Sequence, residues 1–449
     1  MKLTYPGSLH NHTDYSNFRL RDCINTVEGL IDRAIELGHN TVAITEHETV
    51  ASSLRAEKYY KKIKEKHPNF KVIRGNEIYL CRNGLNAQNY NREIDRYFHF
   101  ILLAKDAEGH KQIRELSTRA WMRAYTARGM MRVPTYYSDL EEIIGDNKGH
   151  IIASSACLGG CLPVQLLRYR ENGDSNLYTH IIAWLNYMVS IFGEGNFYLE
   201  MQPSFNEEQI YVNNQIIKLS KEYNIPFIIT NDAHYLKKED ASIHEAFLNS
   251  QDGDREVKAF YETTYLMDNE EIYHFMKNHI GEENLQIAFK NIQEIADRCE
   301  DFSLIKPLKI PRLDWREYPI SLAQHTWVKE IPAFDKFLKS EYEEDKLLAR
   351  ALMYKLDIDE SYRNKKTYNE INACLEDTWV SSEKNNARWS AYYLNLQNII
   401  DLCWDAGSLV GAGRGSGVGF ILLNMLGITQ INPLREKTAT FRWRLTQRV

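Results

Sequence analysis

Imidazole, carboxylate and thiol side chains recur at the ends of the strands that the first half of the sequence predicts. His10 and His12 lie two residues apart on an early extended segment, so both rings share a face. The other candidates follow later strands, and the carboxyl ends of parallel strands meet at one crevice. The candidate ligands are His10, His12, Glu46, His47, Glu77, His99, Cys157, Asp232 and His234.

Metal-assisted hydrolysis is the chemistry that these side chains suit. They are ligands for Zn²⁺, Mn²⁺ or Fe²⁺, and the set is larger than one tetrahedral ion can use, so two or three ions are expected. Two ions about 3.5–4 Å apart can bind a phosphodiester, lower the pKa of a bound water to about 7 and neutralise the leaving oxygen. The set therefore predicts phosphoester hydrolysis.

Each candidate alone also has a plain structural interpretation. A single histidine beside a strand is more often a hydrogen-bonded structural residue than a ligand, but the recurrence at successive strand ends favours the metal site. Cys157 and Cys161 have nearly the spacing of a zinc knuckle. No second Cys or His pair follows at finger spacing, so Cys161 is expected to be a packed thiol.

Six short runs of β-branched or aromatic residues predict the strands that would position this set. They alternate with helical patterns up to about residue 235, which indicates βαβ units and an α/β fold around a mostly parallel sheet. In the first crossover, Thr26 resembles a helix start and Gly38 occupies the place of a C-cap. A second amphipathic helix is predicted over 211–223. The predicted strands are 41–45, 70–80, 97–104, 150–154, 196–201 and 226–230.

The rest of the sequence is mostly helical in pattern. Helical periodicity dominates from 240 to about 302, prolines then interrupt a polar stretch, and periodicity resumes over 335–356. A long helix is predicted over 387–406 and an apolar segment over 418–426. The expected domains are 1–240 with the metal site, 241–305 as a helical connector, and 306–449.

Length, composition and charge exclude several classes of protein. The 449 residues exceed what one core usually holds, and 43% hydrophobic and 26% charged residues are globular averages. No apolar run approaches the roughly 20 residues of a membrane span, so a cytoplasmic protein without a membrane partner is expected. Seven scattered cysteines do not fit a secreted disulfide framework. The net charge of −6 implies that any nucleic acid is held locally.

A second chemical element is the glycine-dense turn over 411–417. Small residues let successive backbone N–H groups face a phosphate, and Arg414 can form a forked pair with phosphate oxygens. A plain tight turn explains the glycines alone equally well. The basic residues between 435 and 448 could contact DNA phosphates or form a solvated charged face.

The segments LHNHTDYS, TVAITEHE, GNEIYL, FHFILLAK, SACLGG and TNDAHYL resemble the successive motifs of the polymerase and histidinol phosphatase (PHP) domain, which opens the alpha subunit of bacterial DNA polymerase III. The resemblance implies a distorted α/β barrel, up to three metal ions and 3′ to 5′ exonuclease proofreading. The implied metal ligands are His10, His12, Asp22, His47, Glu77, His99, Cys157, Asp232 and His234. Those implied to be catalytic are His10, His12, His47, Glu77, Asp232 and His234. Thr-Glu-His-Glu stands here for the family's Thr-Asp-His-Gly, and Arg-Asp-Cys, around Asp22, for its Leu-Asp-Gly.

Residues 409–434 resemble the nucleotide-binding turn of the same family's polymerase palm, an α+β nucleotidyltransferase domain. The implied contacts with an incoming dNTP are Gly413, Arg414, Gly415 and Ser416. In the family, a Pro-Asp-x-Asp motif that holds Mg²⁺ follows a segment resembling 441–445, and this sequence reaches Val449 without it. We therefore expect no DNA synthesis by this chain alone, and expect a second polypeptide or downstream region to complete a DNA-directed DNA polymerase acting on primer-template DNA.

Two other functions stay open on the sequence. A stand-alone phosphatase of the same superfamily, acting on a small phosphomonoester, would use the metal site but would not need the roughly 200 residues that follow it. A non-catalytic domain that supports polymerase structure would keep every activity after loss of His10 and His47.

Overall fold

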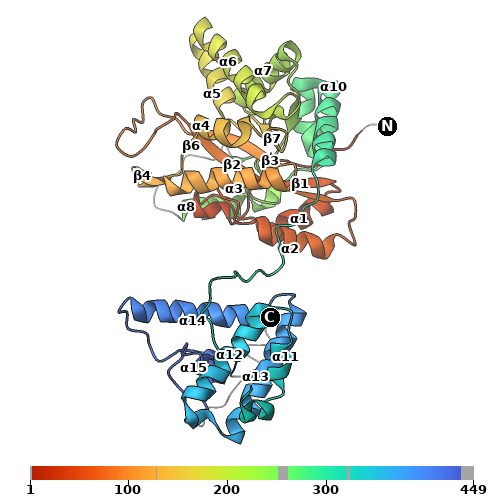
Figure 1. Cartoon of the computed structure of the whole chain (residues 1–449). Coiled ribbons are helices and arrows are strands. Elements are labelled where there is room, and N and C mark those ends of the chain that lie inside the picture. Colours follow the sequence, from red (N-terminus) through yellow and green to blue (C-terminus); the bar gives the residue numbers. More distant parts are fainter. Residues whose placement is uncertain (1–2, 128, 251–260, 320, 322–323, 436–449) are drawn as a thin grey trace. The chain divides into compact units, whose positions relative to one another are not determined.

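The computed structural model describes residues 3–127, 129–250, 261–319, 321 and 324–435. The chain divides into two compact units, Met1–Ile305 and Lys306–Val449 (Figure 1). Each has its own hydrophobic core. None of the helices within the described ranges is both long and apolar enough to span a membrane.

A seven-stranded sheet forms the centre of the first unit. Its strand order is β1-β2-β3-β7-β8-β9, with β6 beside β2. The six strands predicted from the sequence are all present, with each end within one residue of its expected position. The strands are β1 (Thr41–Ile44), β2 (Lys71–Cys81), β3 (Phe98–Ala104), β6 (Thr135–Tyr136), β7 (Ile151–Ser154), β8 (Phe197–Met201) and β9 (Phe227–Ile229).

The sheet is mostly parallel, as predicted, but β3 runs antiparallel to both of its neighbours, β2 and β7. The other pairs in this sheet are parallel. The connection from β2 to β3, residues 82–97, contains turns and no helix. Because a parallel crossover usually needs a helix, this connection returns the chain directly and the next strand pairs antiparallel.

The start of the chain closes the sheet into a distorted barrel. Pro6 O accepts a hydrogen bond from Thr41 N of β1 at 3.1 Å, and His12 N donates to Ala233 O, just after β9, at 3.0 Å. Residues 6–12 therefore lie between the two edges of the sheet. Gly7 permits the close approach, because a Cβ there would lie 1.9 Å from the Thr41 carbonyl oxygen.

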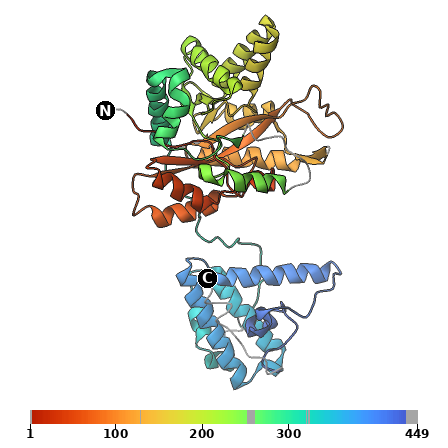
Figure 2. The same ribbon diagram turned by 180° about the vertical axis from the view of Figure 1, so that it is seen from behind.

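Helices cover the sheet of the first unit. α5, α6 and α7 gather at one end of it and α1 and α2 at the opposite end, as two views agree (Figures 1 and 2). α1 begins after Thr26, whose side chain accepts from Gly29 N, and Gly38 beyond its end has φ +75°. These helices are α1 (Val27–Glu36), α2 (Ser53–Ile63), α3 (Ala107–Met122), α4 (Tyr137–Leu140), α5 (Cys161–Asn172), α6 (Ser175–Phe192), α7 (Glu207–Tyr223), α8 (Ala241–Asn249) and α10 (Asn269–Arg298).

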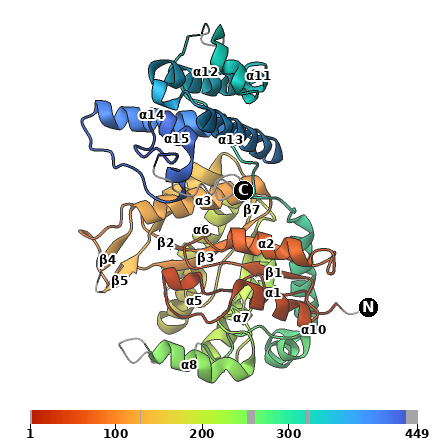
Figure 3. The same ribbon diagram turned by 90° about the horizontal axis from the view of Figure 1, so that it is seen from below.

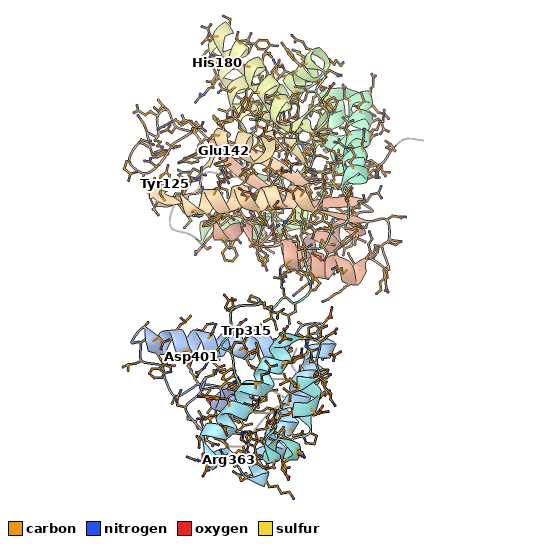
Figure 4. All side chains as sticks on the ribbon, viewed as in Figure 1. Tyr125, Glu142, His180, Trp315, Arg363 and Asp401 are labelled. Atoms are coloured by element: carbon orange, nitrogen blue, oxygen red, sulfur yellow. The ribbon has the colours of Figure 1, made fainter. Side chains whose placement is uncertain are left out.

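Two features of the first unit lie outside the predicted strands. β4 (Tyr125–Ala127) and β5 (Met130–Arg132) pair antiparallel at the side of the unit (Figure 3), and Tyr125 is labelled there in Figure 4. In the segment predicted as a helical connector, α10 packs against β9 and α7. Its Phe289 and Ile292 belong to the same buried core as the sheet, so this helix is part of the first unit.

The described part of the second unit is helical. Phe334, Leu352 and Phe420 are among the buried residues of its core, and Trp315 Nε1 donates to Asn395 of α14 at 2.8 Å (Figure 4). Strands of the kind expected in an α+β palm do not occur in the parts of 306–435 that the structure describes. The helices are α11 (Ala333–Leu338), α12 (Glu343–Ile358), α13 (Lys365–Lys384), α14 (Trp389–Asp405) and α15 (Ile421–Met425).

The buried carboxylate of Asp345 links helices α12 and α14 of the second unit by hydrogen bonds. Asp345 of α12 accepts from Ser340 Oγ, Ser390 Oγ and Arg388 Nη2 at 2.5–2.7 Å. Arg388 also pairs with the exposed Glu383, and Asp345→Asn removes the buried one of its two carboxylate partners, which should lower the free energy of unfolding by about 2–3 kcal/mol. Asp335→Asn, at an exposed pair, should lower it by less than about 1 kcal/mol. Urea denaturation of both variants measures the difference, and equal losses would contradict it.

Candidate metal centre

The predicted metal ligands meet in space although they lie far apart in the sequence of the first unit. Residues 6–12 and the segment after β9 lie side by side, and the segment after β1 pairs with the middle of β2 at His47 and Glu77. Three groups have ligand atoms within 4.8 Å of one another: His12, His47 and His234; His10, His12 and Glu77; and Glu77, His99 and Cys157.

Asp232 and Asp22 complete the cluster. Asp232 Oδ1 lies 3.2 Å from His10 Nε2 and 3.1 Å from His12 Nε2. Asp22 Oδ1 lies 3.3 Å from His47 Nε2, and its Oδ2 lies 3.6 Å from His234 Nε2. The structure thus gathers all nine residues that the family resemblance implies as ligands.

Glu46 is the one strand-end candidate that faces elsewhere. Its two carboxylate oxygens accept hydrogen bonds from the backbone and hydroxyl of Thr13 and from Ser16 Oγ. Successive side chains of an extended segment point to opposite faces, so His47 faces the cluster and Glu46 does not.

Several ligand atoms are buried without a hydrogen bond. These are Asp22 Oδ1, His47 Nε2, Glu77 Oε1 and Asp232 Oδ1. Buried polar atoms nearly always have a partner, and these four instead face other ligand atoms of the cluster at 2.9–3.4 Å without hydrogen-bond geometry. Cations among them would satisfy all four, so the residues present fit a metal centre.

Glu200 orients His10, and the sequence analysis missed it. His10 Nδ1 donates to Glu200 Oε1 at 2.7 Å, which leaves Nε2 directed at the cluster. Ser154 Oγ and Thr230 Oγ1 also donate to this carboxylate. A carboxylate behind a histidine ligand fixes its tautomer and raises its basicity. The signal was present, because Glu200 is the one charged residue of the otherwise apolar strand β8.

His12 has an outer partner of a different kind. Its Nδ1 lies 3.0 Å from Ser16 Oγ, and the Ser16 hydroxyl donates to Glu46 Oε2 at 2.5 Å. Ser16 Oγ therefore accepts a hydrogen bond from His12 Nδ1–H, and Nε2 stays free for a cation. His234 follows the same rule, since its Nδ1 donates to the Asp232 carbonyl oxygen at 2.7 Å.

Opposite charges counteract the effect of burial inside the cluster. Burial lowers the pKa of His47, but Asp22 and Glu77 raise it overall to about 10. Burial raises the pKa of Glu77, while His99 and His47 bring it well below its ordinary value. Burial, with His47 nearby, lowers the pKa of His12 to about 3. Cations compete with protons for such ligands, so metal affinity falls on acidification.

Two residues in or next to the cluster have a left-handed backbone conformation. Asp232 has φ +52° and Glu48 has φ +55°, a region that costs energy for residues other than glycine. Glu48 stands where the PHP motif has glycine, and its carbonyl oxygen accepts from Trp121 Nε1 at 2.7 Å. Gly159 leaves room for a ligand, because a Cβ there would lie 2.9 Å from the His99 ring.

The predicted dNTP-binding turn lies in the second unit and is exposed. Gly413 has φ +126° and Gly415 φ +76°, which glycine adopts without strain, and Arg414 and Ser416 are exposed beside them. Contact with a nucleotide stays a prediction. The segment 441–445 and the basic residues beyond Arg435 lie outside the described residues.

Each of the two units contains a segment that matches a known protein family. Residues 8–204 match the family model of the PHP domain, and residues 346–448 match that of the bacterial DNA polymerase III alpha NTPase domain. "Probable DNA polymerase YorL" of Bacillus subtilis (strain 168) is 37% identical over 95% of this chain and 34% of its own length. DNA polymerase III subunit alpha of Borreliella burgdorferi is 26% identical over 95% of this chain and 33% of its own length.

Among solved structures, a protein from Bifidobacterium adolescentis, described as a metal-dependent phosphoesterase, covers 62% of this chain and 97% of its own, with a TM-score of 0.32 and 13% identity. The chain spans about a third of the length of the curated relatives it matches. The resemblance inferred from the motifs is confirmed: the chain carries a PHP domain over residues 8–204 and, over 346–448, a match to the NTPase domain of the bacterial DNA polymerase III alpha subunit.

Proposed function

We propose that the first unit is a metal-dependent phosphodiesterase that removes nucleotides from the 3′ end of DNA, as a proofreading exonuclease does. The observation that carries this proposal is the set of buried ligand atoms that face one another without hydrogen bonds. The proposed ligands are the nine gathered residues, which hold two or three ions of Zn²⁺, Mn²⁺ or Fe²⁺.

The chain's own residues orient the histidine ligands. Glu200 and Ser16 hold the outer nitrogens of His10 and His12, so that both Nε2 atoms point inward. Asp22, Glu77 and Asp232 supply anionic oxygens. When bound, the ions would lower the pKa of water and neutralise charge on the scissile phosphate and the leaving oxygen.

The second unit is proposed to serve the polymerase rather than the hydrolytic reaction. Gly413, Arg414, Gly415 and Ser416 would contact the triphosphate of a dNTP through backbone N–H groups and the guanidinium. Polymerisation on primer-template DNA would need Mg²⁺ and carboxylates supplied by a further region or a second polypeptide. The proposed domain limits are 1–240 for the metal-binding part, 241–305 for a connector that packs into the core of the same unit, and 306–449.

The purified whole chain tests the hydrolytic function. We expect metal analysis to find two or three ions per chain, and cleavage of a 3′-mismatched primer that stops with EDTA and returns with Mn²⁺ or Zn²⁺. Intact primer at two or more bound ions would contradict the exonuclease. Hydrolysis of small phosphomonoesters with none of DNA would instead favour the stand-alone phosphatase.

A further inference from the structure

A groove of about 380 Å³ lies next to the loop that carries the metal ligand His12. One face of α2 lines it, with Glu28 of α1 and Tyr15 of the loop opposite. α1 and α2 are neighbouring helices, as Figures 1 and 3 show. The hydrolytic proposal gives this groove no role.

The groove is basic although the chain is acidic. α2 carries four basic residues and one acidic residue, while the chain has a net charge of −6. Arg55 is paired with Glu28 at 2.9 Å, so its charge is largely neutralised. Lys58 and Lys62 are exposed and form no ion pair with the residues that the structure describes. Because Glu28 is already paired with Arg55, Lys58 and Lys62 leave the lining with a net positive charge, which suits a polyanion.

Two aromatic rings belong to the loop beside the groove, and Tyr15 is the one that lines it. Phe18 is 68% exposed, and its ring centroid lies 6.1 Å from that of Tyr15, which lines the groove. A single exposed aromatic residue is ordinary, but aromatic faces next to a basic groove are the pattern by which proteins hold single-stranded nucleic acid. In such sites the bases stack on the aromatic rings and the phosphates contact the basic side chains.

The same loop connects the groove to the metal centre. Ser16 accepts from His12 Nδ1 inside the cluster, while its neighbour Tyr15 faces the groove. Three residues of chain span at most about 11 Å, or roughly three nucleotides at the 3.4 Å rise of one strand. A strand held in the groove therefore lies within about three nucleotides of His12, which is itself buried.

We propose that this groove binds single-stranded DNA and leads its 3′ end to the metal centre. The assignment rests on the proposed exonuclease function, but binding can be measured without hydrolysis. The probe is a fluorescent dT12 oligonucleotide, titrated with the whole chain in EDTA and followed by anisotropy. Failure of cleavage with intact binding would count against the nuclease alone.

Charge reversal tests the lysines. Lys58→Glu with Lys62→Glu should weaken dT12 binding at least about fivefold at low salt and reduce the slope of log K against log salt by about 1.4. Lys221→Glu with Lys290→Glu, on exposed positions of α7 and α10, changes the net charge equally and should leave both quantities near wild type. Equal effects of the two pairs would overturn the proposal.

Removal of the exposed ring tests stacking. Phe18→Ala should weaken dT12 binding about fivefold with an unchanged salt slope, because stacking releases no counterions. Phe205→Ala removes another ring of the first unit that is 59% exposed and should have no effect. Unaltered binding by Phe18→Ala, or tighter binding of a blunt duplex than of dT12, would overturn the single-strand assignment.

Discussion

Asp232→Asn is expected to lower the rate of phosphodiester hydrolysis by about 100-fold or more and to remove at least one bound ion per chain. Asp232 Oδ1 lies 3.2 Å from His10 Nε2 and 3.1 Å from His12 Nε2, and it has no hydrogen bond. The substitution keeps the side-chain volume but replaces an anionic oxygen with a neutral amide. Elemental analysis measures the ions, and release of 3′ nucleotides from a primer measures the rate.

Thermal melting separates loss of metal from loss of fold. Ions that bind only the folded chain raise its Tm, so Mn²⁺ or Zn²⁺ should raise the Tm of the wild type more than that of Asp232→Asn. Without metal, Asp232→Asn also loses the carboxylate that faces His10 and His12, so the readout is the rise in Tm on adding metal to each protein, not the Tm of the metal-free state. Asp146→Asn, at an exposed position, is the matched control. Wild-type metal content and rate in Asp232→Asn would contradict the metal centre.

The positions of strands and of most ligands could be predicted because both are local properties of the sequence. A buried strand is an apolar, β-branched run, so β7 and β8 appear at their expected residues. His47 and Asp232 could be predicted as members of a site since each follows such a run. Their meeting at one point then follows from the convergence of parallel strand ends.

Strand direction and loop placement could not be predicted in the same way. β3 is antiparallel because its connection to β2 lacks a helix, and turn-forming loops give little periodic signal. Asp22 follows no strand and was implied only by the family resemblance. Its backbone N–H donates to Asn17 Oδ1 at 3.0 Å, a contact between loop residues that no periodicity reveals.

Substitution of Glu200 tests whether residues that hydrogen-bond to the metal ligands affect metal affinity. Glu200→Gln can still accept from His10 Nδ1 through its amide oxygen, but it loses the negative charge that makes the imidazole a stronger ligand. We expect metal affinity to fall by about 10- to 100-fold, with hydrolysis restored at saturating metal. Metal titrations of activity and of bound ions measure both quantities.

The response to added metal distinguishes a positioning residue from a ligand. Activity of Asp232→Asn should stay low at any metal concentration because a ligand itself is missing, whereas that of Glu200→Gln should recover. Glu207→Gln, at a side chain that is 91% exposed, is the matched control and should titrate as the wild type does. If Glu200→Gln stays inactive at saturating metal, Glu200 must contact the ions or the substrate directly. If its affinity equals that of the wild type, His10 is held by the backbone of residues 6–12 alone, and the outer carboxylate contributes nothing to the centre.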